Sequence, residues 1–151
     1  MGDGKPRQRD KPKADDTKKV VNLEFLIPRR PLSLQAKRTS LRAWQAFVRT
    51  EAAKVWKAPT IQAGDRHLTL VYLCDISPPD TDNIVKPIQD ALIGLVFSDD
   101  ALLSDVESHR RSLYGTFDLT QLPALVLAGL SSGQECVYVK VSSSRSLEEY
   151  L

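Results

Sequence analysis

The spacing of hydrophobic positions along the chain switches repeatedly between the period of strands and the period of helices. Runs rich in β-branched or alternating apolar residues predict strands, at 20–27, 67–75, 104–113 and 135–142. Apolar residues that recur every three or four positions predict helices, at 34–56, 84–96 and 119–130. The run at 67–75 is apolar almost throughout, which is typical of a strand with neighbours on both sides. The predicted order β-α-β-α-β-α-β indicates an α/β or α+β fold, a sheet covered by helices.

The predicted helix at 34–56 has an apolar face and a basic face. The apolar face, expected in the core, comprises Leu41, Trp44, Val48 and Val55. The opposite face comprises Arg38, Arg42, Gln45 and Arg49. A row of arginines is compatible with a solvated surface and with contacts to DNA phosphates, so both roles stay open.

The predicted helix at 84–96 contains Pro87, which lacks a backbone N–H and is tolerated only in a first turn. We therefore expect the regular helix to begin late and the chain near Asp82 to be irregular.

Length and charge divide the chain into a short tail and one domain. With 151 residues the chain is long enough for one domain with its own core, which we assign to 20–151. Residues 1–19 are rich in Lys, Arg, Asp, Gly and Pro, and we expect them to be disordered. The tail carries seven cations and four anions, so the remaining domain is nearly neutral although the whole chain is +2. Any affinity for DNA must therefore come from a local basic patch, with or without help from the tail.

The expected compartment is the cytoplasm. No apolar run approaches the roughly 20 residues that a membrane span requires, and the first residues lack the apolar segment of a secretory signal. The two cysteines, Cys74 and Cys136, lie in apolar strand-like runs, and we expect both to be reduced core residues.

Candidate chemistry is concentrated in five residues that follow the second predicted strand: Asp80, Asp82, Lys86, Asp99 and Asp100. Two carboxylates at i and i+2 on an extended segment point to the same side. A third, Asp99 or Asp100, would return to the same end of the sheet if the intervening helix crosses back. Converging carboxylates raise one another's pKa unless a cation neutralises them. The pattern therefore predicts a site for Mg²⁺, a hard cation that prefers oxygen ligands, with Mn²⁺ as a possible substitute.

Residues next to the acids have expected supporting roles. Lys86 is suited to stabilising the extra negative charge of a phosphodiester transition state or positioning the attacking water. Asn83 is expected to cap the helix or to orient a carboxylate. Asp90 lies one turn after Lys86, where it can form an ion pair with Lys86 or support the metal ligands.

Asp-x-Asp alone is a weak signal, because it more often caps a helix, and glycosyltransferases use it in much longer domains. The longer string is more specific: Asp80-x-Asp82-Asn83-x-x-Lys86-x-x-x-Asp90, followed by Asp99-Asp100. This string resembles the RusA family of crossover-junction endodeoxyribonucleases. The resemblance extends over roughly residues 20 to 142 and includes the Ile-Pro-Arg-Arg-Pro end of the first strand and the final Val-Tyr-Val-Lys-Val strand.

The resemblance implies a small mixed α/β fold that forms a homodimer and cleaves four-way DNA junctions with Mg²⁺. It implies that Asp80, Asp82 and Asp100 bind the metal, that Lys86 is the catalytic lysine, and that Asp99 is the adjacent acid of the pair.

One departure concerns DNA recognition. Well-known family members have a run of arginines before the first acid, whereas the matching stretch here, 75–79, contains no cation. Substitutes elsewhere in the chain are Arg29, Arg30, the row of Arg38, Arg42 and Arg49, and the pair Arg110 and Arg111. The sequence does not choose among them.

Three hypotheses follow. The first is a Mg²⁺-dependent endodeoxyribonuclease that acts on branched DNA as a two-fold dimer, with roles in recombination and repair. The second is a nuclease of the same chemistry with another DNA target, as in a mobile element or defence system. The third is a non-catalytic protein that binds DNA structures. His67 and His109 are expected to have surface or strand roles, and no Ser/His/Asp set, Gly-rich phosphate loop or zinc spacing is present.

Overall fold

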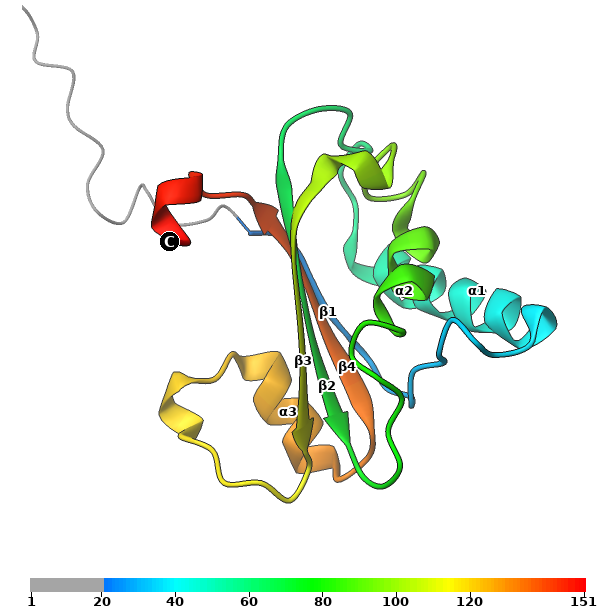
Figure 1. The fold of residues 1–151 in the computed structure, drawn as a ribbon, viewed down its shortest axis with the longest axis vertical. Helices are drawn as coiled ribbons and strands as arrows, with labels where there is room; N and C mark the ends of the chain where they lie inside the picture. The colour runs from blue at the N-terminus through cyan, green and yellow to red at the C-terminus, as the bar shows by residue number, and fades with distance from the viewer. Residues whose placement is uncertain (1–20) are drawn as a thin grey trace, which may run out of the picture.

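The computed structural model describes residues 21–151, which form one mixed sheet with helices on both faces (Figure 1). The predicted tail at 1–19 lies outside the described residues. The strands are β1 (Val21–Ile27), β2 (Arg66–Cys74), β3 (Leu103–Ser112) and β4 (Cys136–Ser143). The α-helices are α1 (Arg38–Val55), α2 (Val85–Leu92) and α3 (Ala124–Ser132). The predicted fold class and order of elements are confirmed.

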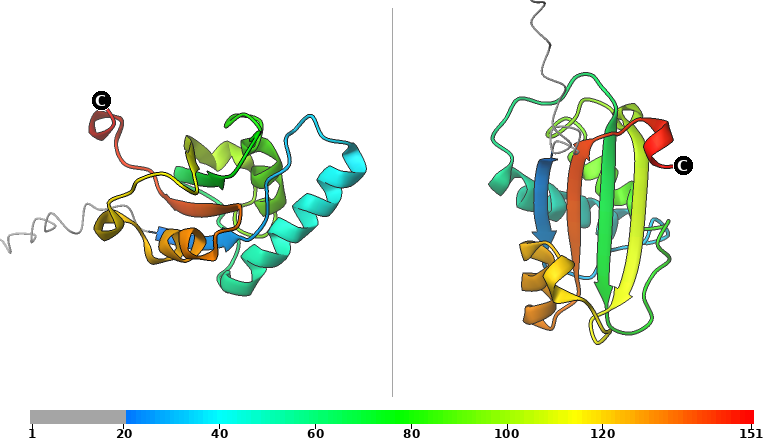
Figure 2. Two further views of the ribbon diagram at one scale, coloured as in Figure 1. Left: turned by 90° about the horizontal axis from the view of Figure 1, so that it is seen from below. Right: turned by 90° about the vertical axis from the view of Figure 1, so that its left-hand side faces the viewer.

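The strand order in the sheet is β1-β4-β2-β3, so β2 lies between two neighbours as its continuous apolar run predicted. β4 runs antiparallel to both β1 and β2, whereas β3 pairs with β2 in parallel. β3 is therefore an edge strand, and the carboxyl ends of β2 and β3 lie at the same end of the sheet (Figure 2, right). A strand and its parallel neighbour need a crossover connection, and here α2 lies in that connection.

Helices α1 and α2 cover one face of the sheet and bury the main core against it (Figure 1). The buried members of this core include Phe25, Ile27, Trp44, Val48, Leu68, Leu70, Tyr72, Ile84, Ile88, Leu92, Val137 and Val139. Helix α3 lies on the other face, where Leu73, Val126, Cys136 and Tyr138 form a second, smaller cluster. Alternation along β2 and β4 sends successive side chains to the two faces, which explains why both strands are apolar on both sides.

All three helices are shorter than predicted, and for α2 and α3 the reason is local. α2 ends at Leu92 rather than near residue 96. Gly94 adopts a φ of +82°, and its N–H donates to the carbonyl of Phe97, so the chain turns there instead of continuing the helix. α3 begins at Ala124 rather than near residue 119, because Pro123 occupies its N-cap and a separate 3₁₀ turn, Leu119–Gln121, precedes it.

The helix predicted at 34–56 begins later, at Arg38, and its buried face differs from the prediction, since Leu41 is only half-buried. Trp44 and Val48 are buried as expected, but Val55 is 51% exposed. Its expected place in the core was wrong: Ala52 and Trp56 are buried at this end of the helix instead.

Both cysteines are reduced and buried, as predicted. Among residues 21–151, no helix is both long enough and apolar enough to cross a membrane. The cytoplasmic location stays a prediction.

Candidate functional site

The two candidate acids Asp80 and Asp82 lie on the segment 75–84, which connects β2 to α2 and passes beside the edge strand β3. Two β3 side chains bind its backbone. Ser108 Oγ donates to the carbonyl of Thr81 at 2.8 Å, and Arg110 Nη1 donates to the carbonyl of Pro79 at 3.3 Å. These two carbonyls flank Asp80, so β3 fixes the position of this residue from both sides.

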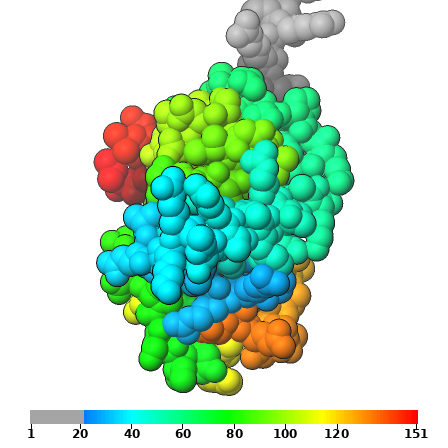
Figure 3. Space-filling model, turned by 90° about the vertical axis from the view of Figure 1, so that its right-hand side faces the viewer, coloured from blue at the N-terminus to red at the C-terminus, as the bar shows by residue number. Residues whose placement is uncertain are grey.

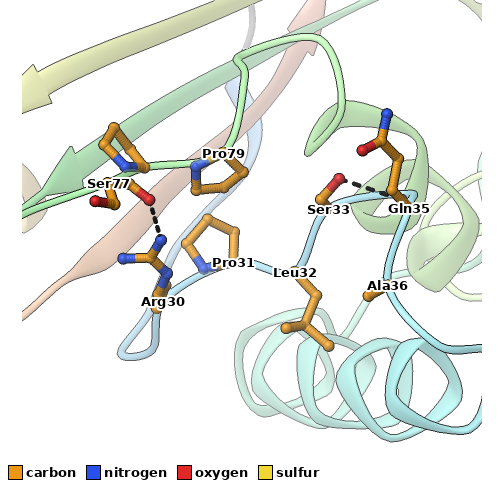
Figure 4. A pocket seen from close by; sticks show the side chains of 9 residues that line it. Arg30, Pro31, Leu32, Ser33, Gln35, Ala36, Ser77 and Pro79 are labelled. Carbon is orange, nitrogen blue, oxygen red and sulfur yellow. Dashed lines mark hydrogen bonds between the residues drawn. The ribbon is translucent and has the colours of Figure 1, made fainter.

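The segment 28–37 binds the opposite side of the same connection. The Leu34 N–H donates to the carbonyl of Asn83 at 2.9 Å. Arg30 donates to the carbonyl of Ile76 at 2.9 Å and also to that of Ser77 (Figure 4). The surface of 28–37 lies beside that of the connection in Figure 3, where the two are blue and green. A shallow cavity of about 370 Å³ separates them, with Arg30, Leu32 and Gln35 on one wall and Ser77 and Pro79 on the other.

Glu135, immediately before β4, contacts β2, the connection 75–84 and the segment 28–37. Its carboxylate accepts hydrogen bonds from the Tyr72 hydroxyl at 2.7 Å and the Asp75 N–H at 2.9 Å. Arg30 forms an ion pair with it at 3.4 Å. Burial alone would raise the pKa of Glu135, but the two hydrogen bonds and the Arg30 charge outweigh burial and lower the pKa. The pKa of Tyr72 is raised well above its usual range by burial and by this carboxylate.

The connection also stores backbone strain. Ser77 adopts a φ of +48°, which a residue with a Cβ rarely does. Such a residue costs roughly 1–3 kcal/mol and persists only where its surroundings fix it. The Arg30 hydrogen bonds to the carbonyls of Ile76 and Ser77 provide that fixation.

Lys86 lies in the first turn of α2 between two carboxylates. Its Nζ is 2.7 Å from Asp100 Oδ2 and 2.8 Å from Asp90 Oδ1, so the predicted i, i+4 pair is confirmed. Hydrogen bonds to Asp100 and then to Asp90 raise the pKa of Lys86 far above neutrality. The Lys86 ammonium in turn lowers the pKa of Asp100, which stays ionised. The site therefore holds a permanent cation and a permanent anion in contact.

The two acids at 99–100 have different surroundings. Asp99 caps the short 3₁₀ turn Asp100–Leu102, because its carboxylate accepts the Ala101 N–H at 2.8 Å. Asp100 pairs with Lys86. Asp80 and Asp82 are both exposed on the neighbouring turn.

The expected convergence of three carboxylates is not assembled: within 21–151, no group of three or more His, Cys, Asp or Glu side chains could hold a metal ion together. Mg²⁺ differs from zinc in that one or two carboxylates, with water and substrate phosphate as the other ligands, suffice for binding. Asp80 and Asp82 fit that smaller requirement, since both are exposed oxygen donors two residues apart.

One supporting role was wrong. Asn83 does not cap α2, because the N-cap residue is Ile84 and no side chain makes a capping hydrogen bond there. Asn83 instead stabilises the turn through its backbone: its N–H donates to the carbonyl of Asp80 at 3.1 Å.

The structure separates the candidate DNA-contacting arginines. Arg30 is bound to Glu135 and to the connection. Arg49 donates to the carbonyls of Ala91 and Ile93 at the end of α2. Arg29 lies over the ring of Phe47, with 3.7 Å from its guanidinium carbon to the ring centroid.

The other four candidates are exposed as well, and Arg110 donates to the Pro79 carbonyl. Arg38 and Arg42 lie on α1. Arg110 and Arg111 lie at the end of β3, next to the acidic segment.

His67 has the strand role that was expected. It is 1% exposed, its Nδ1 is 3.0 Å from the Tyr150 hydroxyl, and its Nε2 is 3.1 Å from Glu107 Oε1. His109 lies in β3, and its Nε2 is 3.3 Å from Oε2 of the same glutamate.

Sequence reasoning missed Ser108, Tyr72 and Glu135. A serine in a strand and a glutamate before one carry no local signal, because their partners lie 27 and 60 or more residues away along the chain.

Comparison with known families supports the nuclease reading. The family model described as endodeoxyribonuclease RusA matches residues 5–116, well over half of the chain. The matched range contains Asp80, Asp82, Lys86 and Asp100 and ends before α3 and β4. Comparison with curated proteins gives no match.

Proposed function

This chain belongs to the RusA family of endodeoxyribonucleases, and on that premise we propose that it is a Mg²⁺-dependent enzyme that cleaves four-way DNA junctions in recombination and repair. One observation carries the proposal for the site: the Asp80–Asp82 turn is fixed from two sides, by Ser108 and Arg110 of β3 and by the segment 28–37. Two exposed carboxylates on a rigid support, followed by the Lys86 ammonium in the first turn of α2, suit the precise positioning that phosphodiester cleavage requires.

Asp80 and Asp82 would hold the ion, with Mn²⁺ as an alternative to Mg²⁺. When bound, the ion would polarise the scissile phosphate and lower the pKa of a coordinated water. Asp99 is proposed only as the acid that shapes the neighbouring turn, because its carboxylate is engaged in capping.

Lys86 would stabilise the charge that develops on the phosphate oxygens in the transition state. Because Asp100 and Asp90 raise its pKa, Lys86 keeps its proton at neutral pH and acts as a fixed charge rather than as a general acid. Asp100, ionised for the same reason, can accept a hydrogen bond from the attacking water. In hydrolysis the water oxygen bonds to phosphorus, the bond to one bridging oxygen breaks, and that oxygen takes up a proton.

A two-fold dimer is part of the proposal. Two active sites related by a two-fold axis match a junction whose opposing strands are themselves related by an approximate two-fold. Cutting both strands symmetrically would resolve the junction.

A second candidate, a nuclease of the same chemistry with another DNA target, is favoured by the cation-free stretch at 75–79. The non-catalytic alternative is weakened by the presence of Asp80, Asp82, Lys86 and Asp100 together.

The experiment compares labelled four-way junction, linear duplex and single strand as substrates, with Mg²⁺, Mn²⁺ or EDTA. We expect wild type to cut the junction in symmetrical positions, to leave the duplex intact and to stop in EDTA. Asp82→Asn is expected to lose cleavage and keep binding. Cleavage of another substrate in preference would support the second candidate, and junction binding without cleavage in either metal would support the third.

A further inference from the structure

Two large apolar side chains lie unusually exposed at the end of the sheet that carries the acidic segment. Ile76, two residues after β2, is 74% exposed, and Tyr114, two residues after β3, is 75% exposed. The turns that carry them adjoin each other, because Cys74 pairs with Ser112 and the Leu113 N–H donates to the carbonyl of Cys74 at 2.9 Å. We name Ile76 and Tyr114 together the strand-end lip.

Single exposed apolar residues are common and need no explanation. Ile76 differs because its backbone is fixed at a cost: the next residue, Ser77, has a φ of +48°, and Arg30 binds the carbonyls of both residues. An isoleucine that is 74% exposed buries little apolar surface in the isolated domain, so its packing does not offset this strain. Strain of this kind is typically found where a binding surface must be held in shape.

Cations adjoin the lip. Arg110 and Arg111 are the last arginines of β3, both are exposed, and successive strand residues point to opposite faces of the sheet. Arg110 contacts Pro79, directly before Asp80. Among residues 21–151 neither arginine forms an ion pair with a carboxylate, in contrast to Arg30. Each guanidinium donates through Nη1 to one backbone carbonyl, Arg110 to Pro79 and Arg111 to Arg110, and its remaining N–H groups can bind phosphates on either side of the lip.

An exposed aromatic ring and an exposed isoleucine, next to two arginines without carboxylate partners, fit nucleic acid whose base planes are accessible. In continuous duplex the base planes are covered by their stacked neighbours, so the lip would have nothing to contact. At a branch point the terminal base pairs of the arms can expose their faces, and stacking on an aromatic side chain is sequence-tolerant.

We propose that the strand-end lip stacks on the base pairs at the branch point of a DNA junction, while Arg110 and Arg111 bind the adjacent phosphates and so take the place of the arginine run absent from 75–79. The inference rests on the proposed function, since it names how the same site selects branched DNA. It assigns junction selectivity to apolar stacking and general affinity to the two arginines.

The test measures DNA binding in the cleavage-deficient Asp82→Asn background, so that binding is observed without turnover. Dissociation constants are determined for a four-way junction and a linear duplex of the same arm sequence, with Tyr114→Ala, Ile76→Ala and the matched control Leu147→Ala. Leu147 is also largely exposed, at 66%, but lies in the C-terminal turn after β4. A junction carrying 2-aminopurine at the branch point reports stacking on the exposed base, because stacking quenches its fluorescence.

We expect Tyr114→Ala to weaken junction binding roughly five- to a hundredfold and to leave duplex binding within about twofold, with Ile76→Ala intermediate. Tyr114→Phe, which keeps the ring, should retain junction binding, and Leu147→Ala should change nothing. The 2-aminopurine fluorescence of the complex should be higher in Tyr114→Ala than in the parent, because the ring that stacks on the probe and quenches it is lost. Arg111→Ala should weaken junction and duplex alike and reduce the salt dependence of binding by about one ion.

Equal losses on junction and duplex in Tyr114→Ala, or no loss on either, would overturn the inference. So would conversion of a dimer to a monomer by Tyr114→Ala in sedimentation analysis, because the lip would then serve a second copy of the chain. These outcomes are distinct from failure of the proposed function, which would appear as absence of junction preference in the Asp82→Asn parent itself.

Discussion

Removal of the Glu135 carboxylate is the sharpest perturbation of the support beneath the acidic segment. In Glu135→Ala the Tyr72 hydroxyl loses its acceptor, and Tyr72 is fully buried. An unsatisfied buried hydroxyl costs about 1–3 kcal/mol. The lost ion pair with Arg30, which is 43% exposed, adds no more than about 1 kcal/mol.

The expected loss in free energy of unfolding is therefore about 1–4 kcal/mol, which corresponds to a fall in Tm of about 3–15 °C for a domain of this size. Urea titration monitored by tryptophan fluorescence and circular dichroism measures it directly. Tyr72→Phe removes the other partner while keeping the ring, and the double variant Tyr72→Phe/Glu135→Ala closes a thermodynamic cycle.

If Glu135 acts through Tyr72, the double variant should be more stable than the sum of the two single changes predicts. A coupling free energy below about 0.5 kcal/mol, the range of independent sites, would refute the reasoning. Unchanged junction cleavage in Glu135→Ala would complete the refutation. It would show that the contacts of Glu135 with the Asp75 N–H and Arg30 are not needed to position the acidic segment.

Three further predictions concern other parts of the account. Lys86→Met should lower the single-turnover cleavage rate about 10²–10³-fold and leave junction binding nearly intact. Lys86→Arg, which keeps the positive charge, should retain part of the rate. Unchanged cleavage in Lys86→Met would exclude Lys86 from the chemistry. Because its pKa is lowered on folding, Glu135 should stabilise the folded state above its unfolded-state pKa of about 4.3, and this contribution should disappear as the pH falls through the lowered folded-state pKa. Urea titrations from pH 7 to pH 3 should show the difference in stability between wild type and Glu135→Gln closing in acid. A difference that stays constant with pH would contradict the lowered pKa. Gly129→Ala should destabilise the domain by about 1–3 kcal/mol, because its added Cβ would lie 2.8 Å from Cys136 Sγ. The double variant Gly129→Ala/Cys136→Ala should recover much of the lost stability. Equal stability of Gly129→Ala and wild type in the same urea titration would show that α3 can shift away from the contact.

The strands and the order of elements could be predicted because each depends on short-range alternation of apolar residues. The central place of β2 followed from its apolar run at 67–75. A strand that is covered on both faces has apolar residues at successive positions, whereas a strand with one solvated face alternates apolar and polar residues. Helix ends were less accessible. Gly94 and Pro123 are the residues that end or delay a helix, but apolar spacing continues past each of them and hides the boundary.

The site was predictable only where partners are close in sequence. Lys86 and Asp90 lie one helical turn apart, and their ion pair followed from that spacing. Contacts that depend on how the sheet and the connection pack were not predictable. Ser108 on Thr81 and Glu135 on Tyr72 join residues that only the register of β3 and β4 brings together.

The choice among candidate arginines was likewise a matter of packing. Arg30 and Arg49 look like surface cations in the sequence, yet each binds backbone carbonyls of a neighbouring element. Arg110 looked no different, but the parallel pairing of β3 with β2 brings it to Pro79, beside the first acid.

The central claim is that the exposed carboxylates of the Asp80–Asp82 turn, and not acidic charge in general, carry metal-dependent cleavage. The most direct measurement is the single-turnover rate of four-way junction cleavage in Mg²⁺ for Asp82→Asn and for Asp75→Asn. Asp75 is a matched control, because it is an exposed aspartate of the same connection and its substitution removes the same charge. The account predicts near-wild-type cleavage by Asp75→Asn and a loss of at least about a hundredfold in Asp82→Asn; equal rates for the two variants would contradict it.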